Sequence, residues 1–112
     1  MVRFNVWVEN RELTMKEYIL CAAIWYKDFP LANYQPKNVD RGVVLCGHRH
    51  AGIIAQHVTL MGKRAAEMGE YEQGFITSEN RFIDRKEGMK IASDGGQVLS
   101  YNSGQLYSED LY

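Results

Sequence analysis

The stretch that most restricts how this chain can fold is residues 73–92, QGFITSENRFIDRKEGMKIA. Two short apolar segments, 75–76 and 82–83, flank a turn-forming segment at 78–80. This order predicts two neighbouring strands joined by a tight turn. Asp84 then stands where a helix N-cap belongs, with a glutamate three residues later, so a helix is expected to begin at once.

Three basic residues surround the start of this helix: Arg81, Arg85 and Lys86. A helix N-terminus already carries a partial positive charge, so cations are unusual there unless they serve a purpose. Arginine forks beside free backbone N–H groups are typical of a site that binds an anion, above all phosphate. The alternative is an exposed surface on which Asp84 and Glu87 neutralise the cations.

Length and charge exclude several classes of protein. The 112 residues are expected to form one domain, residues 1–112. Lys plus Arg total 13 against 14 for Asp plus Glu, which argues against a nucleic-acid polymer or an acidic membrane surface as partner. The first residues do not resemble a signal peptide, and Cys21 and Cys46 lie in apolar segments. A cytoplasmic protein with reduced, buried cysteines is therefore expected.

The remaining elements follow from apolar periodicity. Three more strands are expected at 2–8, 18–26 and 43–46, with a long loop at 27–41. The segment 18–26 is apolar throughout, which predicts a strand buried on both faces. A long helix is expected from His48 to Met68, with Gly69 ending it and Gly62 inside it. Together these elements predict an α+β fold, with a small antiparallel sheet and two main helices.

A second basic cluster lies in CGHRH, where His48, Arg49 and His50 follow a predicted strand and open the long helix. Two basic helix starts in one small domain indicate a site for a pyrophosphate or for two separate phosphates. A zinc site is not favoured, because one helix cannot aim His48 and His57 at a common ion and no CxxC or HExxH spacing is present. Cys46 is read as a core residue rather than a nucleophile.

Aromatic residues supply candidates for binding a base. Phe75 lies near the turn that holds Asn80, so a ring and an amide could contact a nucleobase. The alternative is that Phe75 belongs to the core. In the C-terminal segment QVLSYNSGQLYSEDLY, four residues are too apolar to remain in water: Leu106, Tyr107, Leu111 and Tyr112. The segment is therefore expected to dock on its own domain or on a partner subunit.

The order of CGHRH, QGF, RFIDR, KIA and LYSEDLY across residues 18–112 resembles small phage-encoded Thoeris anti-defence proteins of the first type. The resemblance implies a dimeric protein in the cytoplasm of an infected bacterial host. It implies a sponge rather than an enzyme, with no cofactor and no metal. Such proteins bind cyclic ADP-ribose isomers made by TIR-domain proteins without cleaving them, and related members also bind short cyclic oligonucleotides.

The resemblance also implies ligand contacts for six residues: Arg49, His50, Phe75, Asn80, Arg81 and Arg85. The three arginines would hold the pyrophosphate and ribose, and Phe75 and Asn80 would contact the adenine. His50 would add a further contact.

Two other functions stay open. One is a small hydrolase or lyase acting on an ADP-ribose-like phosphoester, with His48 or His50 as general acid or base. The other is a protein inhibitor that covers a partner surface with the aromatic segment 106–112.

Overall fold

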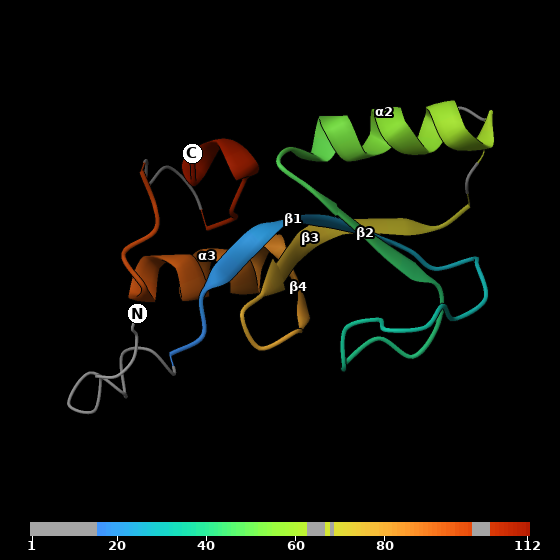
Figure 1. Cartoon of the computed structure of the whole chain (residues 1–112). Coiled ribbons are helices and arrows are strands. Elements are labelled where there is room, and N and C mark those ends of the chain that lie inside the picture. Colours follow the sequence, from blue (N-terminus) through green and yellow to red (C-terminus); the bar gives the residue numbers. More distant parts are fainter. Residues whose placement is uncertain (1–15, 63–66, 68, 100–103) are drawn as a thin grey trace, which may run out of the picture.

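The computed structural model describes residues 16–62, 67, 69–99 and 104–112. These residues form a four-stranded antiparallel sheet with two α-helices, which confirms the predicted α+β class (Figure 1). The strand expected at 2–8 lies outside the described residues.

The sheet contains β1 (Ile19–Tyr26), β2 (Val43–Gly47), β3 (Tyr71–Thr77) and β4 (Phe82–Asp84), in the order β2-β1-β3-β4. Every neighbouring pair is antiparallel. The apolar run of β1 explains its central place, since Ala22, Ala23 and Ile24 are all fully buried. A strand buried on both faces was expected here, and the middle of β1 confirms it.

The two helices cover different ends of the sheet. The first, α2 (His50–Met61), packs on β1 and β2, and the second, α3 (Arg85–Asp94), packs mainly on β3 and β4 (Figure 1). The start of α3 agrees with the sequence pattern, because the Asp84 carboxylate accepts a hydrogen bond of 2.8 Å from the Glu87 backbone N–H. Gly95 is its C-cap.

The long helix differs from the prediction at both ends. It begins at His50, so His48 and Arg49 precede it, and it ends at Met61 rather than Met68. Gly62 adopts a left-handed conformation with φ 69°, and its N–H donates to the Val58 carbonyl at 2.8 Å. Glycine takes this conformation at little cost, so Gly62 is the C-cap residue and not an interior residue of the helix.

The main core lies between the sheet and both helices. It joins Ile24 of β1, Ile53 of α2, Phe75 of β3 and Met89 of α3 with Leu106, which comes from the C-terminal segment. Leu106 is 0 % exposed, so of the two predicted outcomes for this segment the structure shows docking on its own domain. A short 3-10 turn, η2 (Ser108–Asp110), follows.

The loop between β1 and β2 covers the other face of the sheet and reaches both of its edges. The Gln35 side-chain oxygen accepts a hydrogen bond of 2.8 Å from the Val44 N–H on β2. Asn38 exchanges two hydrogen bonds with the Phe82 backbone on β4, at 2.7 and 2.8 Å. The two amide side chains thus form hydrogen bonds with backbone groups of both outer strands, β2 and β4.

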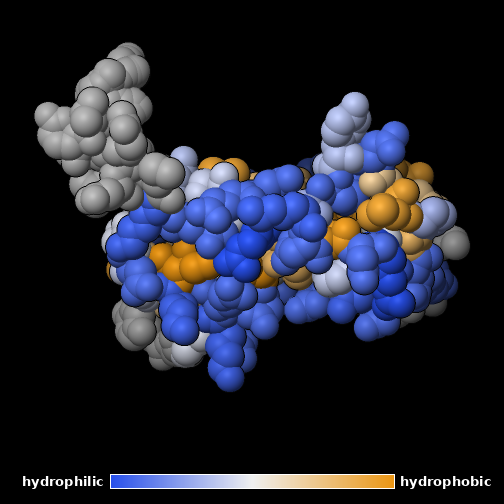
Figure 2. Space-filling view, turned by 90° about the horizontal axis from the view of Figure 1, so that it is seen from below, coloured by the Kyte–Doolittle hydropathy of each residue, from blue (hydrophilic) through white to orange (hydrophobic). Residues whose placement is uncertain are grey.

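The surface seen from below the view of Figure 1 is largely hydrophilic, with apolar side chains in separate small areas (Figure 2). Within the part of the chain that the structure describes, no helix is both long and apolar enough to cross a bilayer.

Candidate anion site at the C-terminal segment

Arg49 lies at the junction of β2 and α2, where it is the residue that precedes the helix in extended conformation. Its Nη2 donates a hydrogen bond to the backbone oxygen of Tyr112, and its guanidinium carbon lies 5.1 Å from the centre of the Tyr112 ring. The His48 ring stacks on the same tyrosine, with 4.3 Å between centroids and 23° between planes. The Arg49 Nη1 atom is buried, and within the described residues it has no hydrogen-bond acceptor.

Arg85 opens α3 and reaches the same C-terminal segment from the other helix. Its Nη1 donates to the Leu106 carbonyl at 2.8 Å and its Nη2 to the Gln73 side-chain oxygen at 2.5 Å. Its guanidinium carbon lies 4.3 Å from the centre of the Tyr107 ring. Burial lowers the pKa of Arg85 from its usual value, although an arginine remains charged at neutral pH.

His50 is a buried link between these elements. Its Nε2 lies 2.8 Å from the Gly74 carbonyl, and because a carbonyl can only accept, Nε2 carries the proton and donates. The imidazole also meets the edge of Phe75 at 5.2 Å between centroids. Burial is the main cause of a lowered pKa for His50, and the charge of Arg85 lowers it further. The ring is therefore neutral at neutral pH.

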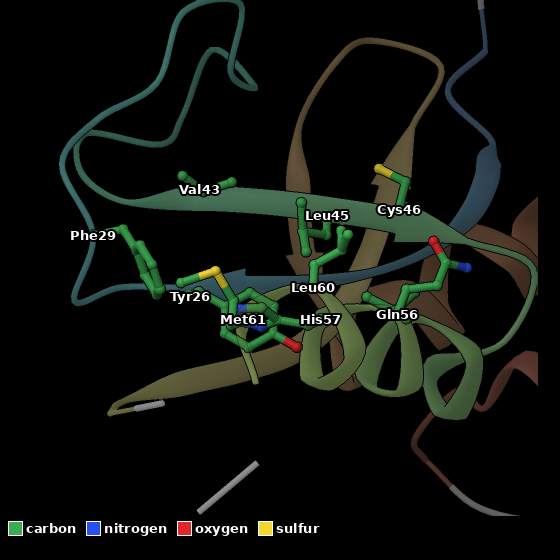
Figure 3. Close-up of a pocket in the computed structure, with 10 residues that line it drawn as sticks. Tyr26, Phe29, Val43, Leu45, Cys46, Gln56, His57, Leu60 and Met61 are labelled. Carbon is green, nitrogen blue, oxygen red and sulfur yellow. The ribbon is translucent and has the colours of Figure 1, made fainter. Parts of the chain in front are cut away.

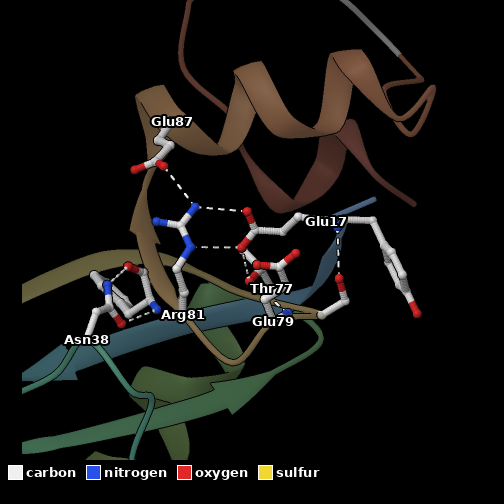
Figure 4. A network of polar contacts seen from close by, with 9 residues as sticks. Glu17, Asn38, Thr77, Glu79, Arg81 and Glu87 are labelled. Carbon is white, nitrogen blue, oxygen red and sulfur yellow. Dashed lines mark hydrogen bonds and ion pairs between the residues drawn. The ribbon is translucent and has the colours of Figure 1, made fainter. Parts of the chain in front are cut away.

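Arg81 is held by a different set of partners (Figure 4). Its Nε and Nη2 donate to the two oxygens of Glu17, each at 2.9 Å, and Nη2 also donates to Glu87 at 3.0 Å. The hydrogen bond from Arg81 is the main reason why the pKa of Glu17 lies below its usual value. Two carboxylates thus balance this arginine: Glu87, as the alternative for the cluster proposed, and Glu17, which takes the place expected for Asp84.

Of the other two predicted contacts, Asn80 is placed apart from Arg49 and Arg85, whereas Phe75 lies in the main core with Leu106. Asn80 is exposed in the β3–β4 turn, with φ 60°, and its carbonyl accepts a hydrogen bond of 2.9 Å from the Lys37 N–H. Phe75 is 0 % exposed. The structure thus brings Arg49, His50 and Arg85 to the C-terminal segment, with Phe75 beneath it.

The tyrosines of the C-terminal segment were not anticipated as partners of the arginines. Tyr107 and Tyr112 lie on Arg85 and Arg49, and Gln73 adds a hydrogen bond to Arg85. The sequence indicated that this segment would dock, but only the fold shows where.

The prediction that both cysteines are buried is wrong. Cys46 is exposed and Cys21 is half-buried, because α2 covers only one face of β2 and both thiols belong to the other face. The pKa of Cys21 falls to about 7, mainly because the Cys46 thiol donates a hydrogen bond to its sulfur. Neither cysteine forms a disulfide. Over residues 16–62, 67, 69–99 and 104–112, no group of three His, Cys, Asp or Glu side chains is placed to hold a metal ion.

Fold and site together define a small α+β protein in which a C-terminal segment covers two arginines at helix starts. Residues 18–112 match the family described as Phage T4 y16D protein, and the chain belongs to this family. It is thus a phage protein, which confirms that part of the resemblance. Neither the curated proteins nor the solved structures contain a match.

Proposed function

We propose that this phage protein binds a cyclic ADP-ribose isomer made by TIR-domain proteins and holds it without cleaving it. The observation that carries the proposal is that Arg49 and Arg85, from two helix starts, converge on one segment and each lies over a tyrosine ring. Guanidinium forks suit the phosphates of a cyclic ADP-ribose, and the face that each arginine now turns to a tyrosine ring would also suit an adenine ring.

The C-terminal segment now occupies both arginines with backbone oxygens. Arg85 donates to the Leu106 carbonyl, and Arg49 donates to a backbone oxygen of Tyr112. A guanidinium–phosphate hydrogen bond joins two ionised groups and can be bidentate, so it is stronger than a guanidinium bond to a neutral carbonyl. The Arg49 Nη1 atom is still without an acceptor among the described residues. A pyrophosphate that replaced the neutral Leu106 carbonyl on Arg85 and reached Arg49 Nη1 would therefore gain electrostatic energy.

Displacement of the segment would also uncover the aromatic residue that the resemblance assigns to the adenine. Phe75 and Leu106 both pack against Gly88 of α3. If Leu106 leaves the core, its side chain no longer covers Phe75, and its carbonyl no longer accepts the hydrogen bond from Arg85. Exposing a leucine costs about 1.5–3 kcal/mol, which two charge-assisted phosphate contacts can offset.

The histidines support binding more than acid–base chemistry. The proton on His50 Nε2 is engaged by the Gly74 carbonyl, and the His48 ring stacks on Tyr112. The hydrolase alternative requires one of these rings to move a proton at the ligand. We also expect a homodimer with ligand sites near the subunit interface, which sedimentation of the purified protein tests.

The decisive experiment is calorimetry with a purified cyclic ADP-ribose isomer, followed by chromatography of the nucleotide released on heating. A sponge gives saturable binding and returns the nucleotide intact. A linear product formed in excess of the protein would establish the hydrolase instead. If neither heat nor conversion is observed, the proposed ligand is wrong, and the protein-inhibitor alternative comes first.

A further inference from the structure

A groove of about 330 Å³ lies between the C-terminal half of α2, the strands β1 and β2, and the loop after β1 (Figure 3). Its volume is at the lower end of pockets that bind small molecules, which span roughly 300–1,000 Å³. It is remote in sequence from Arg85 and the C-terminal segment, and none of those residues lines it.

The lining combines aromatic and aliphatic side chains. Tyr26, Phe29 and His57 supply the rings, and Leu45, Leu60 and Met61 are among the aliphatic residues. The His57 ring meets Tyr26 edge-on at 4.1 Å between centroids and lies 5.8 Å from Phe29. Leu60 is 82 % exposed, so the groove is open to solvent on the helix side.

The lining residues include no Asp, Glu, Lys or Arg. A charged occupant would therefore lose its hydration without gaining an ion pair. Rings that meet edge-on and offset leave faces and edges that suit another planar ring. These two properties favour a neutral aromatic molecule.

His57 brings a polar ring to the groove. The residue is only 6 % exposed, and within the described part of the chain its Nδ1 is buried without a hydrogen-bond partner. A buried ring nitrogen usually has a partner, and one without needs an explanation. Burial lowers the pKa of His57, so at neutral pH the ring is uncharged and offers one donor and one acceptor.

We propose that this groove binds an uncharged planar heteroaromatic molecule of about bicyclic size, whose polar group pairs with the imidazole of His57. The aromatic lining holds the rings, and His57 selects for the polar group. The inference is independent of the anion site and of the proposed function.

The test uses the full chain with methionine methyl groups labelled for NMR, at mildly alkaline pH. The probes are indole, isoquinoline and naphthalene, which have similar shapes but carry a donor, an acceptor and no polar group. We expect the Met61 methyl signal to shift, while that of Met89, buried in the main core, stays constant. Either indole or isoquinoline should bind about fivefold more tightly than naphthalene, as one hydrogen bond provides.

Variants decide whether the groove and His57 are responsible. His57→Phe should remove the preference for the heterocycle and leave naphthalene affinity within about twofold. Leu60→Lys, at the exposed rim, should weaken all three probes, whereas Tyr34→Ala, a fully exposed aromatic elsewhere, should change none. An unmoved Met61 signal with every probe, equal affinity for all three, or a preference that survives His57→Phe would each overturn the proposal.

Discussion

Leu106 and Phe75 meet at Gly88: a Cβ added to this glycine would lie 3.3 Å from the Leu106 Cδ2 and 3.2 Å from the Phe75 Cδ1. A strand, a helix and the C-terminal segment are therefore packed at one point. The same segment carries the tyrosines that lie on Arg49 and Arg85. Its docking thus links the stability of the core to the state of the candidate site.

The substitution Leu106→Ala should lower the free energy of unfolding by about 2–5 kcal/mol, because it leaves a cavity in the main core. Urea unfolding followed by circular dichroism measures this change. Leu31→Ala is the matched control, since Leu31 is largely exposed and should change stability by no more than about 0.5 kcal/mol. Equal, small effects in both variants would show that the C-terminal segment does not complete the core in solution.

Arg49 and Tyr112 are in contact, yet their substitutions should shift nucleotide affinity in opposite directions. Arg49→Ala removes a phosphate donor and should weaken binding by about 1.5–3 kcal/mol, as Arg85→Ala should. Tyr112→Ala weakens the hold of the C-terminal segment on Arg49 and should strengthen binding by about 1 kcal/mol. Calorimetry with a cyclic ADP-ribose isomer compares these variants with Arg41→Ala, an exposed arginine bound to Glu70.

A loss of affinity in Tyr112→Ala as large as that in Arg49→Ala would contradict displacement of the segment. It would make the Tyr112 ring a part of the ligand site. Wild-type affinity in both arginine variants would instead refute the anion site itself.

Arg81→Gln should affect stability more than binding. Its partners Glu17 and Glu87 would lose their cation, at a cost of about 1 kcal/mol for such a partly exposed network. Nucleotide affinity should stay within about twofold of the wild type, because the two carboxylates already use this guanidinium. If affinity instead falls as far as in Arg85→Ala, Arg81 contacts the ligand as the family resemblance implies.

Acid should destabilise the fold in two separate pH ranges. The first range involves His50 and His57, whose pKa values burial lowers from 6.5 in the folded state. As pH falls below 6.5, these histidines take up protons more readily in the unfolded chain than in the native state. The free energy of unfolding should therefore fall as pH drops below about 6.5, by at most about 1.4 kcal/mol per pH unit for each histidine. Denaturant titrations at a series of pH values measure this slope, and His57→Phe should reduce it.

The second range involves Glu17, whose folded-state pKa is lowered by Arg81. Its contribution is present above the usual glutamate value of 4.5 and is lost as pH falls below it. Arg81→Gln should flatten the profile there and leave the histidine range unchanged. A wild-type slope at low pH in that variant would show that the Glu17–Arg81 contact does not persist in solution.

The sequence predicted the elements whose signals are local. The strand β1 was anticipated from its continuous apolar run, and the start of α3 from the spacing of Asp84 and Glu87. The end of α2 was missed because apolar residues continue at helical spacing beyond Gly62. Periodicity reports which residues suit a buried face, but the left-handed conformation of one glycine decides where the helix ends.

For the candidate site, the sequence indicated the cations but not what covers them. Arg49 and Arg85 stand out as basic residues at helix starts, a pattern visible over a few positions. Their contacts with Tyr112 and Leu106 span 63 and 21 residues, and such pairs are set by the docking of the whole segment. The balance of Arg81 by Glu17, 64 residues away, depended equally on tertiary structure.

The amides of Gln35 and Asn38 have a consequence for the behaviour of the protein in a crowded cell. Outer strands with unpaired backbone groups are templates on which further chains can add and grow into fibrils. The β1–β2 loop places one amide on Val44 and another on Phe82, and so engages backbone groups at both margins of the sheet. The loop thereby limits the addition of further strands at both edges of the sheet. Substitution of Gln35 or Asn38 would leave backbone groups of one edge strand unpaired.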